Sequence, residues 1–383
     1  MSLRVLSIGH SYVVGANRAL MREVARDPRL EVTVAGPAFF HGDLRPVCFE
    51  PEPPGSQLST CRVPARWTSR IHVFRYSHHC LEELLRNGRF DVVHAWEEPY
   101  IYAGYQIATA MNGSRARFCF RTAQSYVKWY PPPFSVFERT GLKRAQGWIA
   151  GANLVYKAML QRGYPERRGR VLTLAVDTSV FRPLSSAERS SVLLELGLTP
   201  PVVGFVGRFT EAKGLDVLLR AMEQVKRSSD WSLLLLGSGE YGRRIRAWAA
   251  NRGWSRRVCL RLVKHDEVPR YLGAMDLLVA PSQTRRNWRE QFGRMLIEAF
   301  ACGVPVIGSD SGEIPHVVGD AGKIVAEADV DGWATAITNL LRDPAARAEF
   351  AARGLERVQR YSVTSVAQQY RDYFQWLRDQ PLS

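Results

Sequence analysis

The sequence predicts an α/β protein built from two doubly wound domains, and three observations lead to this fold class. The chain has 383 residues, more than one compact domain usually holds, and 46% of them are hydrophobic. Short apolar runs alternate with helical patterns of roughly 10–15 residues, which is typical of parallel βα units. The alternation is interrupted once, at residues 181–201, and then restarts.

The first half of the chain contains strand and helix patterns in a regular order. The strand patterns are short and apolar, whereas the helical patterns repeat apolar residues at a spacing of three or four. Strands are predicted at 4–10, 31–37, 91–97, 117–123, 147–152 and 170–177, and helices at 15–26, 99–112, 135–146 and 153–164.

The second half repeats this pattern after a junction that is polar at first and ends in two prolines. Strands are predicted at 202–209, 231–239, 257–263, 275–282, 304–310 and 321–325, and helices at 215–226, 241–253 and over the tail 331–378. We therefore predict an N-terminal domain over 1–180 and a C-terminal domain over 181–361. Two such domains are expected to enclose a cleft at the carboxyl ends of their strands, where open α/β sheets bind ligands.

The charge is unevenly distributed. The net charge is +15, and residues 1–180 contain 24 Lys and Arg against 14 Asp and Glu, whereas residues 181–383 contain 28 against 23. A basic N-terminal half suits an anionic membrane surface or an acidic acceptor, although a basic solvated face is the simpler alternative. No nucleic-acid-binding motif accompanies the charge, so nucleic acid is not an expected partner.

The cysteines and the apolar runs indicate a cytoplasmic protein. The six cysteines are scattered without zinc-binding spacing, which predicts reduced thiols and no metal site. The N-terminal residues do not follow a signal-peptide pattern, and no run of about 18 apolar residues occurs. We expect a protein that lies in the cytoplasm, with an anionic membrane as a peripheral contact.

Two loops of the second half carry residues suited to a diphosphate. Arg208 and Lys213 follow one strand pattern and precede a helix, where two cations and free backbone N–H groups can bind phosphates. Gly237 and Gly239 follow the next strand and would let the backbone approach a ligand, or would simply form a turn.

The segment EQFGRMLIE, residues 290–298, predicts a site for a ligand rich in hydroxyl groups. Glu290 stands just before a predicted helix, and the free N–H groups of Phe292 and Gly293 can bind a phosphate or sugar oxygen. Glu298 lies more than one turn into the helix among apolar residues, where a carboxylate without a partner is costly. Its two oxygens could accept both hydroxyls of a ribose. The alternative is a capped helix with an exposed Glu298.

The order of these segments resembles the retaining glycosyltransferases of family 4, which have the GT-B fold of two Rossmann-like domains. The resemblance is carried by VGRFTEAKG, LLLLGSGE, MDLLVAPS and EQFGRMLIEAFACGVPVIGSDSGEIP, in which EQFGRMLIE matches the E-x7-E motif of that family. The match is close over residues 170–325 and looser over 1–169. It implies an enzyme that transfers a hexosyl group from a nucleotide sugar, such as a UDP-sugar or GDP-sugar, to a hydroxyl acceptor without a metal or cofactor.

The resemblance also implies roles for particular residues. Arg208 and Lys213 would hold the diphosphate, Glu290 the sugar hydroxyls and Glu298 the ribose. The loop around Val263 would lie near the base, and the C-terminal helix, 362–383, would join the N-terminal domain. That N-terminal domain would bind the acceptor.

The N-terminal half departs from the family pattern at two places. The loop after the first strand reads GHSYVVGANR, with Gly9 and Gly15 in place of a Gly-Gly pair, and Gly15 is the residue expected near the donor phosphate. Many relatives have a His after the strand that corresponds to 117–123, where this chain has Gln124. Gln can form hydrogen bonds with a hydroxyl but cannot exchange a proton at neutral pH.

Other polar and aromatic residues of the N-terminal half are candidates for acceptor binding. His94, Glu97 and Glu98 stand at the end of one predicted strand, and a structural role for each is the alternative. Segment 125–148, which includes Tyr126, combines aromatic residues with prolines and cations, as do sugar-stacking platforms and membrane interfaces.

Two other classes of protein are weighed against an active enzyme. A catalytically weak GT-B protein that binds a nucleotide sugar or serves as a scaffold is the main alternative, because of Gln124 and the altered first loop. A sugar-nucleotide epimerase is disfavoured, because the first strand is not followed by G-x-G-x-x-G.

Overall fold

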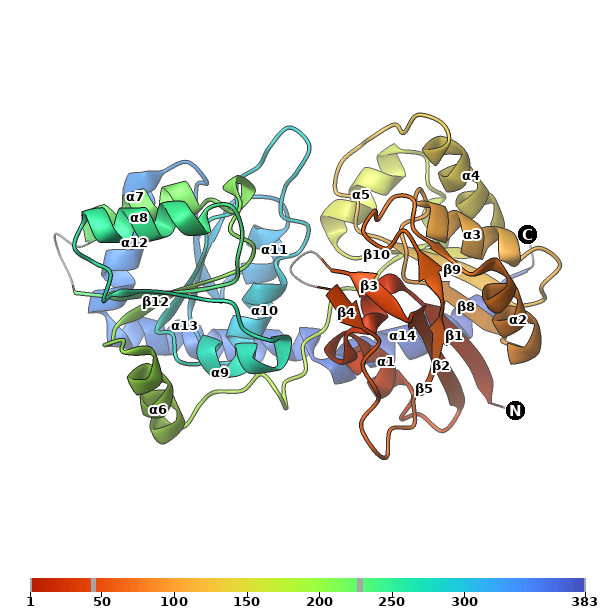
Figure 1. Cartoon of the computed structure of the whole chain (residues 1–383), viewed down its shortest axis with the longest axis horizontal. Helices are drawn as coiled ribbons and strands as arrows, with labels where there is room; N and C mark the ends of the chain where they lie inside the picture. Colours follow the sequence, from red (N-terminus) through yellow and green to blue (C-terminus); the bar gives the residue numbers. More distant parts are fainter. Residues whose placement is uncertain (1, 43–45, 226–229, 382–383) are drawn as a thin grey trace. The chain divides into compact units, whose positions relative to one another are not determined.

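The computed structural model describes residues 2–42, 46–225 and 230–381, which form two compact units (Figure 1). The N-terminal unit comprises Met1–Thr173 together with Val363–Ser383, and the C-terminal unit comprises Leu174–Ser362. The segment after Thr173 pairs within the C-terminal unit, where Val176 N–H donates to the carbonyl of Tyr361 at 2.9 Å. The domain limits predicted above, which also divide donor from acceptor binding, stay predictions, as does the cleft.

The N-terminal unit is built on a sheet of seven parallel strands. From edge to edge the strands are β11 (Gly169–Val171), β10 (Gly147–Ala150), β9 (Arg117–Thr122), β8 (Val92–Ala95), β1 (Leu3–Ile8), β2 (Leu30–Pro37) and β5 (Ser59–Val63). Two short antiparallel ribbons accompany the sheet: β3 (Phe39–His41) with β4 (Pro46–Cys48), and β6 (Ala65–Arg66) with β7 (Arg75–Tyr76).

Helices cover this sheet, and the last of them comes from the far end of the sequence. The helices are α1 (Ala19–Val24), α2 (His78–Gly88), α3 (Tyr102–Ala110), α4 (Phe134–Arg144), α5 (Asn153–Gln161) and α14 (Val363–Arg378), with 3-10 turns at η1 (His10–Val13), η2 (Gly15–Arg18) and η3 (Glu166–Arg168). Helix α14 packs against α1 and β8, and its Tyr370 hydroxyl accepts a hydrogen bond from buried Arg121 at 2.9 Å.

The C-terminal unit contains a six-stranded sheet, again parallel throughout. Its strands lie in the order β14 (Val258–Arg261), β13 (Ser232–Leu236), β12 (Val202–Val206), β15 (Leu277–Ala280), β16 (Val306–Ser309) and β17 (Gly322–Val325). Its helices are α6 (Ser186–Leu196), α7 (Leu215–Val225), α8 (Gly242–Asn251), α9 (Val268–Leu272), α10 (Arg294–Ala301), α11 (Ile314–Val318), α12 (Val330–Arg342) and α13 (Pro344–Arg357), with 3-10 turns at η4 (Glu211–Lys213), η5 (His265–Glu267) and η6 (Val358–Tyr361).

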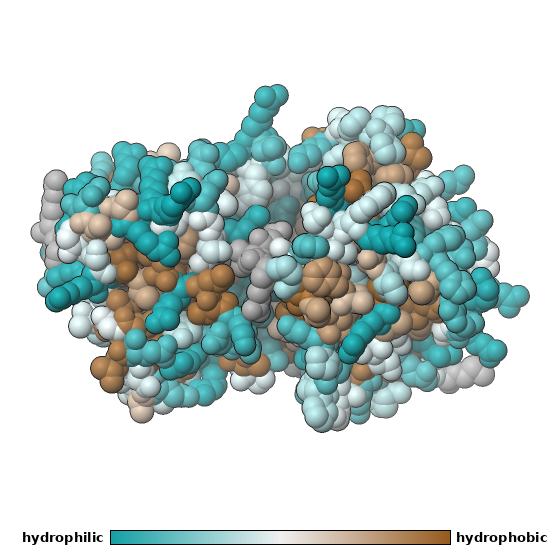
Figure 2. Space-filling view, viewed as in Figure 1, coloured by the Kyte–Doolittle hydropathy of each residue, from teal (hydrophilic) through white to brown (hydrophobic). Residues whose placement is uncertain are grey.

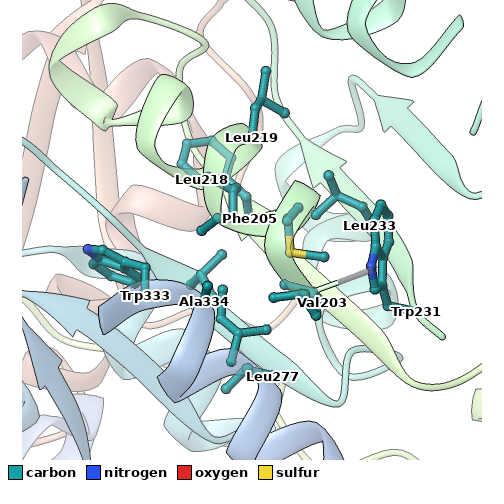
Figure 3. Packing of buried hydrophobic residues seen from close by; sticks show 14 of the residues in the cluster. Val203, Phe205, Leu218, Leu219, Trp231, Leu233, Leu277, Trp333 and Ala334 are labelled. Atoms are coloured by element: carbon teal, nitrogen blue, oxygen red, sulfur yellow. The ribbon is translucent and has the colours of Figure 1, made fainter. Parts of the chain in front are cut away.

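A hydrophobic core lies between this second sheet and the helices α7 and α12 (Figure 3). Phe205 of β12, Leu218 of α7 and Trp333 of α12 are each at most 2% exposed. Burying side chains of this size stabilises the folded unit by about 1.5–3 kcal/mol each. The core therefore fixes the carboxyl ends of β12 and β15, from which the loops of the candidate site begin.

Both sheets have the strand order of a Rossmann-like fold, which confirms the predicted fold class. In each, the chain starts in the middle of the sheet, adds strands toward one edge, and then returns to add strands on the other side. The reversal, or switch point, falls between β1 and β8 in the N-terminal unit and between β12 and β15 in the C-terminal unit. Loops separate at a switch point, which leaves a crevice at the carboxyl ends of the strands.

Candidate functional site

The switch point of the C-terminal unit brings together two residues that lie 77 positions apart. Lys213 belongs to the loop after β12, and Glu290 belongs to the loop after β15. Lys213 Nζ lies 2.6 Å from Glu290 Oε2, and the side chains are only 13% and 10% exposed. Ser282 Oγ donates a second hydrogen bond to the same carboxylate oxygen at 2.9 Å.

Backbone contacts hold these two loops together. Gln283 N–H donates to the carbonyl of Ala212 at 2.8 Å, which joins the loop after β15 to η4. Gly214 ends η4 at a φ of 72°, and a Cβ there would lie 1.8 Å from the carbonyl oxygen of Pro281. Only glycine allows this approach, so Gly214 places the Lys213 side chain against the second loop.

The pair has the chemistry to bind a ligand with both phosphate and hydroxyl groups. An ammonium attracts phosphate oxygens, and a carboxylate accepts hydrogen bonds from hydroxyls. One contact leaves further N–H donors on Lys213 and the second oxygen of Glu290 for a ligand. Trp288 adds an aromatic face at the same place, because its ring centre lies 5.0 Å from Lys213 Nζ.

Glu298 lies in α10 and provides a second carboxyl group near this loop. The residue is 6% exposed, and none of the described residues donates a hydrogen bond to its side chain. Burial raises the pKa of Glu298 to about 7, and the positive charge of Arg294 opposes this shift. The sequence-based alternative of an exposed Glu298 is therefore wrong.

The raised pKa of Glu298 predicts a pH-dependent stability. The unfolded chain ionises this carboxyl at an ordinary pKa near 4.5, whereas the folded chain retains the proton up to about 7. The contribution of Glu298 to the free energy of unfolding is therefore fully present below about pH 4.5. It falls by about 3 kcal/mol as the pH rises to about 7. Glu298→Gln should remove this loss. The free energy of unfolding in urea, taken as variant minus wild type, should therefore be larger at about pH 8 than at about pH 4.5. Parallel pH profiles of the two proteins would contradict the assignment.

The other residues that were predicted to bind the donor lie in three loops of the C-terminal unit. Arg208 is exposed in the loop after β12. Val263 is half-buried next to exposed Leu262, in the loop after β14. Gly293 has a φ of 83° at the start of α10, and Phe292 is buried against the ring of Tyr361. Their roles toward a donor stay predictions.

Gly237 and Gly239 have a structural explanation. A Cβ at Gly237 would lie 1.9 Å from the carbonyl oxygen of Gly207, and a Cβ at Gly239 would lie 2.5 Å from that of Phe209. Both glycines therefore let the loops after β12 and β13 pack together, whether or not a ligand binds there.

The N-terminal unit holds a comparable pair at its own switch point. His10 follows β1, and Glu97 follows β8. The Glu97 carboxylate is fully buried and lies 2.7 Å from His10 Nδ1, and it also accepts hydrogen bonds from the His10 N–H at 2.6 Å and the Tyr76 hydroxyl at 2.9 Å. Glu97 is therefore a group that orients the partly exposed His10.

Gly15 has a protein partner in this structure. Its N–H donates to Glu50 Oε2 at 2.6 Å, and Arg18 donates to the carbonyl of Glu50. The amide expected near the donor phosphate is thus held by a carboxylate, and its role in donor binding stays a prediction.

The remaining acceptor-side candidates differ in exposure. His94 is fully buried, with its Nδ1 2.9 Å from Ser7 Oγ and the ring of Phe374 beside it, and burial lowers its pKa to about 3. This position is structural and gives no support to acceptor contact through His94. Gln124 and Tyr126 are half-buried, and Gln124 Nε2 donates to the Tyr100 hydroxyl at 2.8 Å.

Glu98 lies beside Gln124 at the end of β9. Its carboxylate accepts hydrogen bonds at 2.7 Å from Ala123 N–H and Thr122 Oγ1, while burial raises its pKa to about 7. It is therefore a group that can change protonation near neutral pH, which Gln124 cannot do.

Sequence analysis gave no role to three residues that the structure brings to the switch points. Ser282 ends a predicted strand, Trp288 is the only aromatic residue of the arginine-rich loop 284–290, and His10 follows the first strand. A polar or aromatic residue directly after a central parallel strand is the signal that could have identified Ser282 and His10.

The described residues contain neither a metal-binding cluster nor a membrane-spanning helix. Within residues 2–42, 46–225 and 230–381, three or more His, Cys, Asp or Glu side chains do not cluster in a way that could hold a metal ion. In the same part of the chain, no helix has the length and apolar character needed to cross a membrane.

Part of the C-terminal unit is similar to a known family of sequences. Residues 189–357 match the family Glycosyl transferases group 1. The chain is 35% identical over 194 residues to a GDP-mannose-dependent monoacylated alpha-(1-6)-phosphatidylinositol monomannoside mannosyltransferase of Corynebacterium glutamicum, covering 49% of this chain and 51% of that protein. It is 28% identical over 366 residues to a phosphatidyl-myo-inositol mannosyltransferase of Mycolicibacterium smegmatis, covering 91% and 86%. The match thus spans about half the length of the first of these relatives.

Comparison with solved structures identifies the fold. A glycosyltransferase from Rickettsia africae superposes with a TM-score of 0.77 at 16% identity, covering 99% of this chain and 100% of that one. Anabaena Alr3699/HepE in complex with UDP and glucose superposes with a TM-score of 0.75 at 17% identity, covering 98% and 100%. The family match thus lies in the C-terminal unit, and the chain, with its two Rossmann-like sheets, has the GT-B fold.

Proposed function

We propose that this protein is a retaining glycosyltransferase that moves a hexosyl group from a nucleoside-diphosphate sugar to a hydroxyl acceptor. The observation that carries the proposal is the Lys213–Glu290 pair at the switch point of the C-terminal unit. A nucleotide sugar presents the two kinds of group that this pair would bind, a diphosphate and sugar hydroxyls. Buried Glu298 would accept hydrogen bonds from the ribose.

The proposed reaction needs neutralisation of the departing diphosphate. Lys213 and Arg208 would supply this positive charge, and the first N–H groups of α10, near Phe292 and Gly293, would add to it. The bond from the anomeric carbon to the phosphate oxygen breaks, and a bond from the acceptor oxygen forms on the same face of the sugar. The departing phosphate oxygen would take the proton of the acceptor hydroxyl, so Gln124 need not exchange a proton. With these cations in place, we propose a reaction that requires neither a metal nor a cofactor.

The relatives suggest which substrates to test first. Several are named for GDP-mannose as donor and for phosphatidylinositol mannosides or D-inositol 3-phosphate as acceptors. We propose a GDP-sugar or UDP-sugar donor, with GDP-mannose as the first choice, and an acceptor that contains a polyol such as inositol. The N-terminal unit would bind the acceptor, with His10 oriented by Glu97 and with Glu98, Gln124 and Tyr126 as polar contacts.

We further propose that the protein works in the cytoplasm at an anionic membrane surface, as a peripheral protein, and that it does not bind nucleic acid. The 24 Lys and Arg against 14 Asp and Glu in residues 1–180 support the membrane contact. The lack of a nucleic-acid-binding motif argues against nucleic acid as a partner.

A second candidate function is a GT-B protein that binds a nucleotide sugar without efficient turnover. The hydrogen bond between Gln124 and Tyr100, at a position where many relatives have a proton-exchanging His, favours it. Turnover of a nucleotide sugar by the purified protein without any partner would exclude this function.

A thermal-shift panel of nucleoside diphosphates and nucleotide sugars, with EDTA present, tests the donor site. A ligand that binds only the folded state adds about 2.7 kcal/mol of stability at a hundred times its dissociation constant. We expect a rise in melting temperature for one base, largest for its sugar conjugate, and loss of this rise in Glu298→Ala. If neither GDP nor UDP compounds raise the melting temperature of wild type, the proposed donor site is wrong.

A further inference from the structure

Exposed apolar side chains gather on one part of the N-terminal unit. Among the described residues, six of the nine large hydrophobic side chains that are exposed belong to this unit. We call these six the apolar edge; they are Phe39, Trp67, Ile71, Val127, Trp129 and Val136. Trp129 is 79% exposed and Trp67 is 57% exposed, which is unusual for residues of this size.

Contacts join the three separate segments that carry the apolar edge. His41 Nδ1, two residues after Phe39, lies 2.9 Å from the hydroxyl of Thr68, the neighbour of Trp67. The ring of His72, the neighbour of Ile71, lies 6.1 Å from the ring of Phe134 at the start of α4. The exposed residues at positions 39, 67–71 and 127–136 therefore belong to adjoining segments.

The segment that carries Trp129 is held in place by its neighbour. The ring of Tyr130 stacks on Tyr100 at 4.2 Å, and the guanidinium of Arg162 lies 5.1 Å from its ring centre. Arg162 in turn forms a buried ion pair with Glu138 of α4. Because Tyr130 packs inward, Trp129 is directed to solvent by an anchored backbone.

In the two segments that carry five of the six residues of the apolar edge, the exposed charge has one sign. Segments 64–77 and 123–144 contain seven Lys and Arg, and their single carboxylate, Glu138, is buried in the ion pair with Arg162. Arg75 lies over the ring of Trp67 at 4.4 Å, and Lys143 stands two helical turns from Val136 on the same side of α4. In Figure 2, brown side chains of this unit lie around β3 and near α4, with teal side chains between them.

We propose that the apolar edge is the surface with which this protein binds an anionic phospholipid bilayer. Tryptophan favours the interface between lipid and water, and cations beside it pair with anionic headgroups. The absence of exposed carboxylates in segments 64–77 and 123–144 gives the surface charge complementarity to such a membrane rather than to a mixed-charge protein surface. The inference rests on the membrane contact of the proposed function and gives it a location; it does not depend on the transfer reaction.

Co-sedimentation with vesicles tests the proposal. Wild type should bind phosphatidylcholine vesicles that contain phosphatidylglycerol and should bind pure phosphatidylcholine vesicles much more weakly. Trp129→Ser and Trp67→Ser should each reduce binding at least fivefold, and Lys143→Gln should reduce it about fivefold, the effect expected for one cation near the surface. Higher salt should weaken wild-type binding.

Matched controls come from the C-terminal unit. Leu194→Ser and Leu262→Ser remove side chains that are 84% and 56% exposed but lie outside the apolar edge, and they should leave vesicle binding unchanged. All variants should retain the wild-type thermal shift with nucleoside diphosphate, which separates failure of this surface from failure of the donor site.

The proposal would be overturned if wild type bound neutral and anionic vesicles equally, or if Trp129→Ser bound anionic vesicles as strongly as wild type. Loss of self-association in Trp129→Ser, measured by sedimentation velocity without an effect on vesicle binding, would assign the surface to a second copy of the chain.

Discussion

Replacing Lys213 with alanine is expected to reduce kcat/KM for transfer by about 10²–10³-fold while the protein stays folded. The reason is that Lys213 would stabilise the charge that develops on the departing diphosphate, and removal of one such preorganised group costs about this much. Its partner Glu290 also has Ser282 as a hydrogen-bond donor, so the carboxylate is not left alone. Initial rates with the donor found in the thermal-shift panel measure the effect.

The partner variant distinguishes a donor site from a structural ion pair. Glu290→Gln should also lose most transfer, since it weakens contacts to the sugar hydroxyls, by about 10–100-fold for charged hydrogen bonds. However, it should bind the sugar-free nucleoside diphosphate more tightly than wild type, because Lys213 no longer has a carboxylate 2.6 Å away. Glu349→Gln, at an exposed pair in α13, is the matched control and should leave both quantities unchanged. Equal weakening of sugar-free and sugar-bearing ligands in Glu290→Gln would count against the proposed division of roles.

Arg162→Met and Glu138→Gln are each expected to destabilise the N-terminal unit by about 3–5 kcal/mol. The two side chains are 2% and 11% exposed and lie 2.5 Å apart, so loss of one leaves the other buried without its partner. Tyr164 also donates to Glu138, so the carboxylate keeps one hydrogen-bond donor after Arg162 is replaced. Urea unfolding measures the change.

A double-mutant cycle supplies the control for this pair. The variant with both replacements should be less destabilised than the sum of the single variants, because neither charge is then buried alone. The exposed pair Arg353–Glu349 should contribute about 1 kcal/mol or less in the same assay. Additive losses at residues 138 and 162 would mean that the two charges are not coupled.

Local sequence patterns were enough to predict the alternating elements and the segment 290–298. Runs such as 202–209 and 231–239 show their apolar character directly, and the carboxylates of Glu290 and Glu298 stand at a spacing that a helix start explains. The pairing of Lys213 with Glu290 was not predictable in the same way. It depends on β12 and β15 being neighbours, and strand order is not encoded in a local pattern.

Two other predicted residues have surroundings that a local sequence pattern could not show. His94 stands at the end of a strand, where ligand-binding residues are common, but α14 covers it with Tyr370 and Phe374 from nearly 280 residues later in the chain. Strands of a parallel sheet are buried on both faces, so the sequence does not show on which side such a covering helix lies. Gly15 is similar, since its partner Glu50 comes from a loop 35 residues away.

The discontinuity of the N-terminal unit affects how the protein folds during synthesis. Residues 174–362 are contiguous and contain the whole second sheet, so the core of this unit forms from one uninterrupted stretch of chain. The unit that begins at the first residues lacks α14 until the chain has been extended to Arg378, and until then the surface of α1 and β8 against which α14 packs stays uncovered. Domains usually fold in the order in which they leave the ribosome. In this protein we expect the N-terminal unit to stay incomplete until α14 has been made, although its sheet is synthesised first.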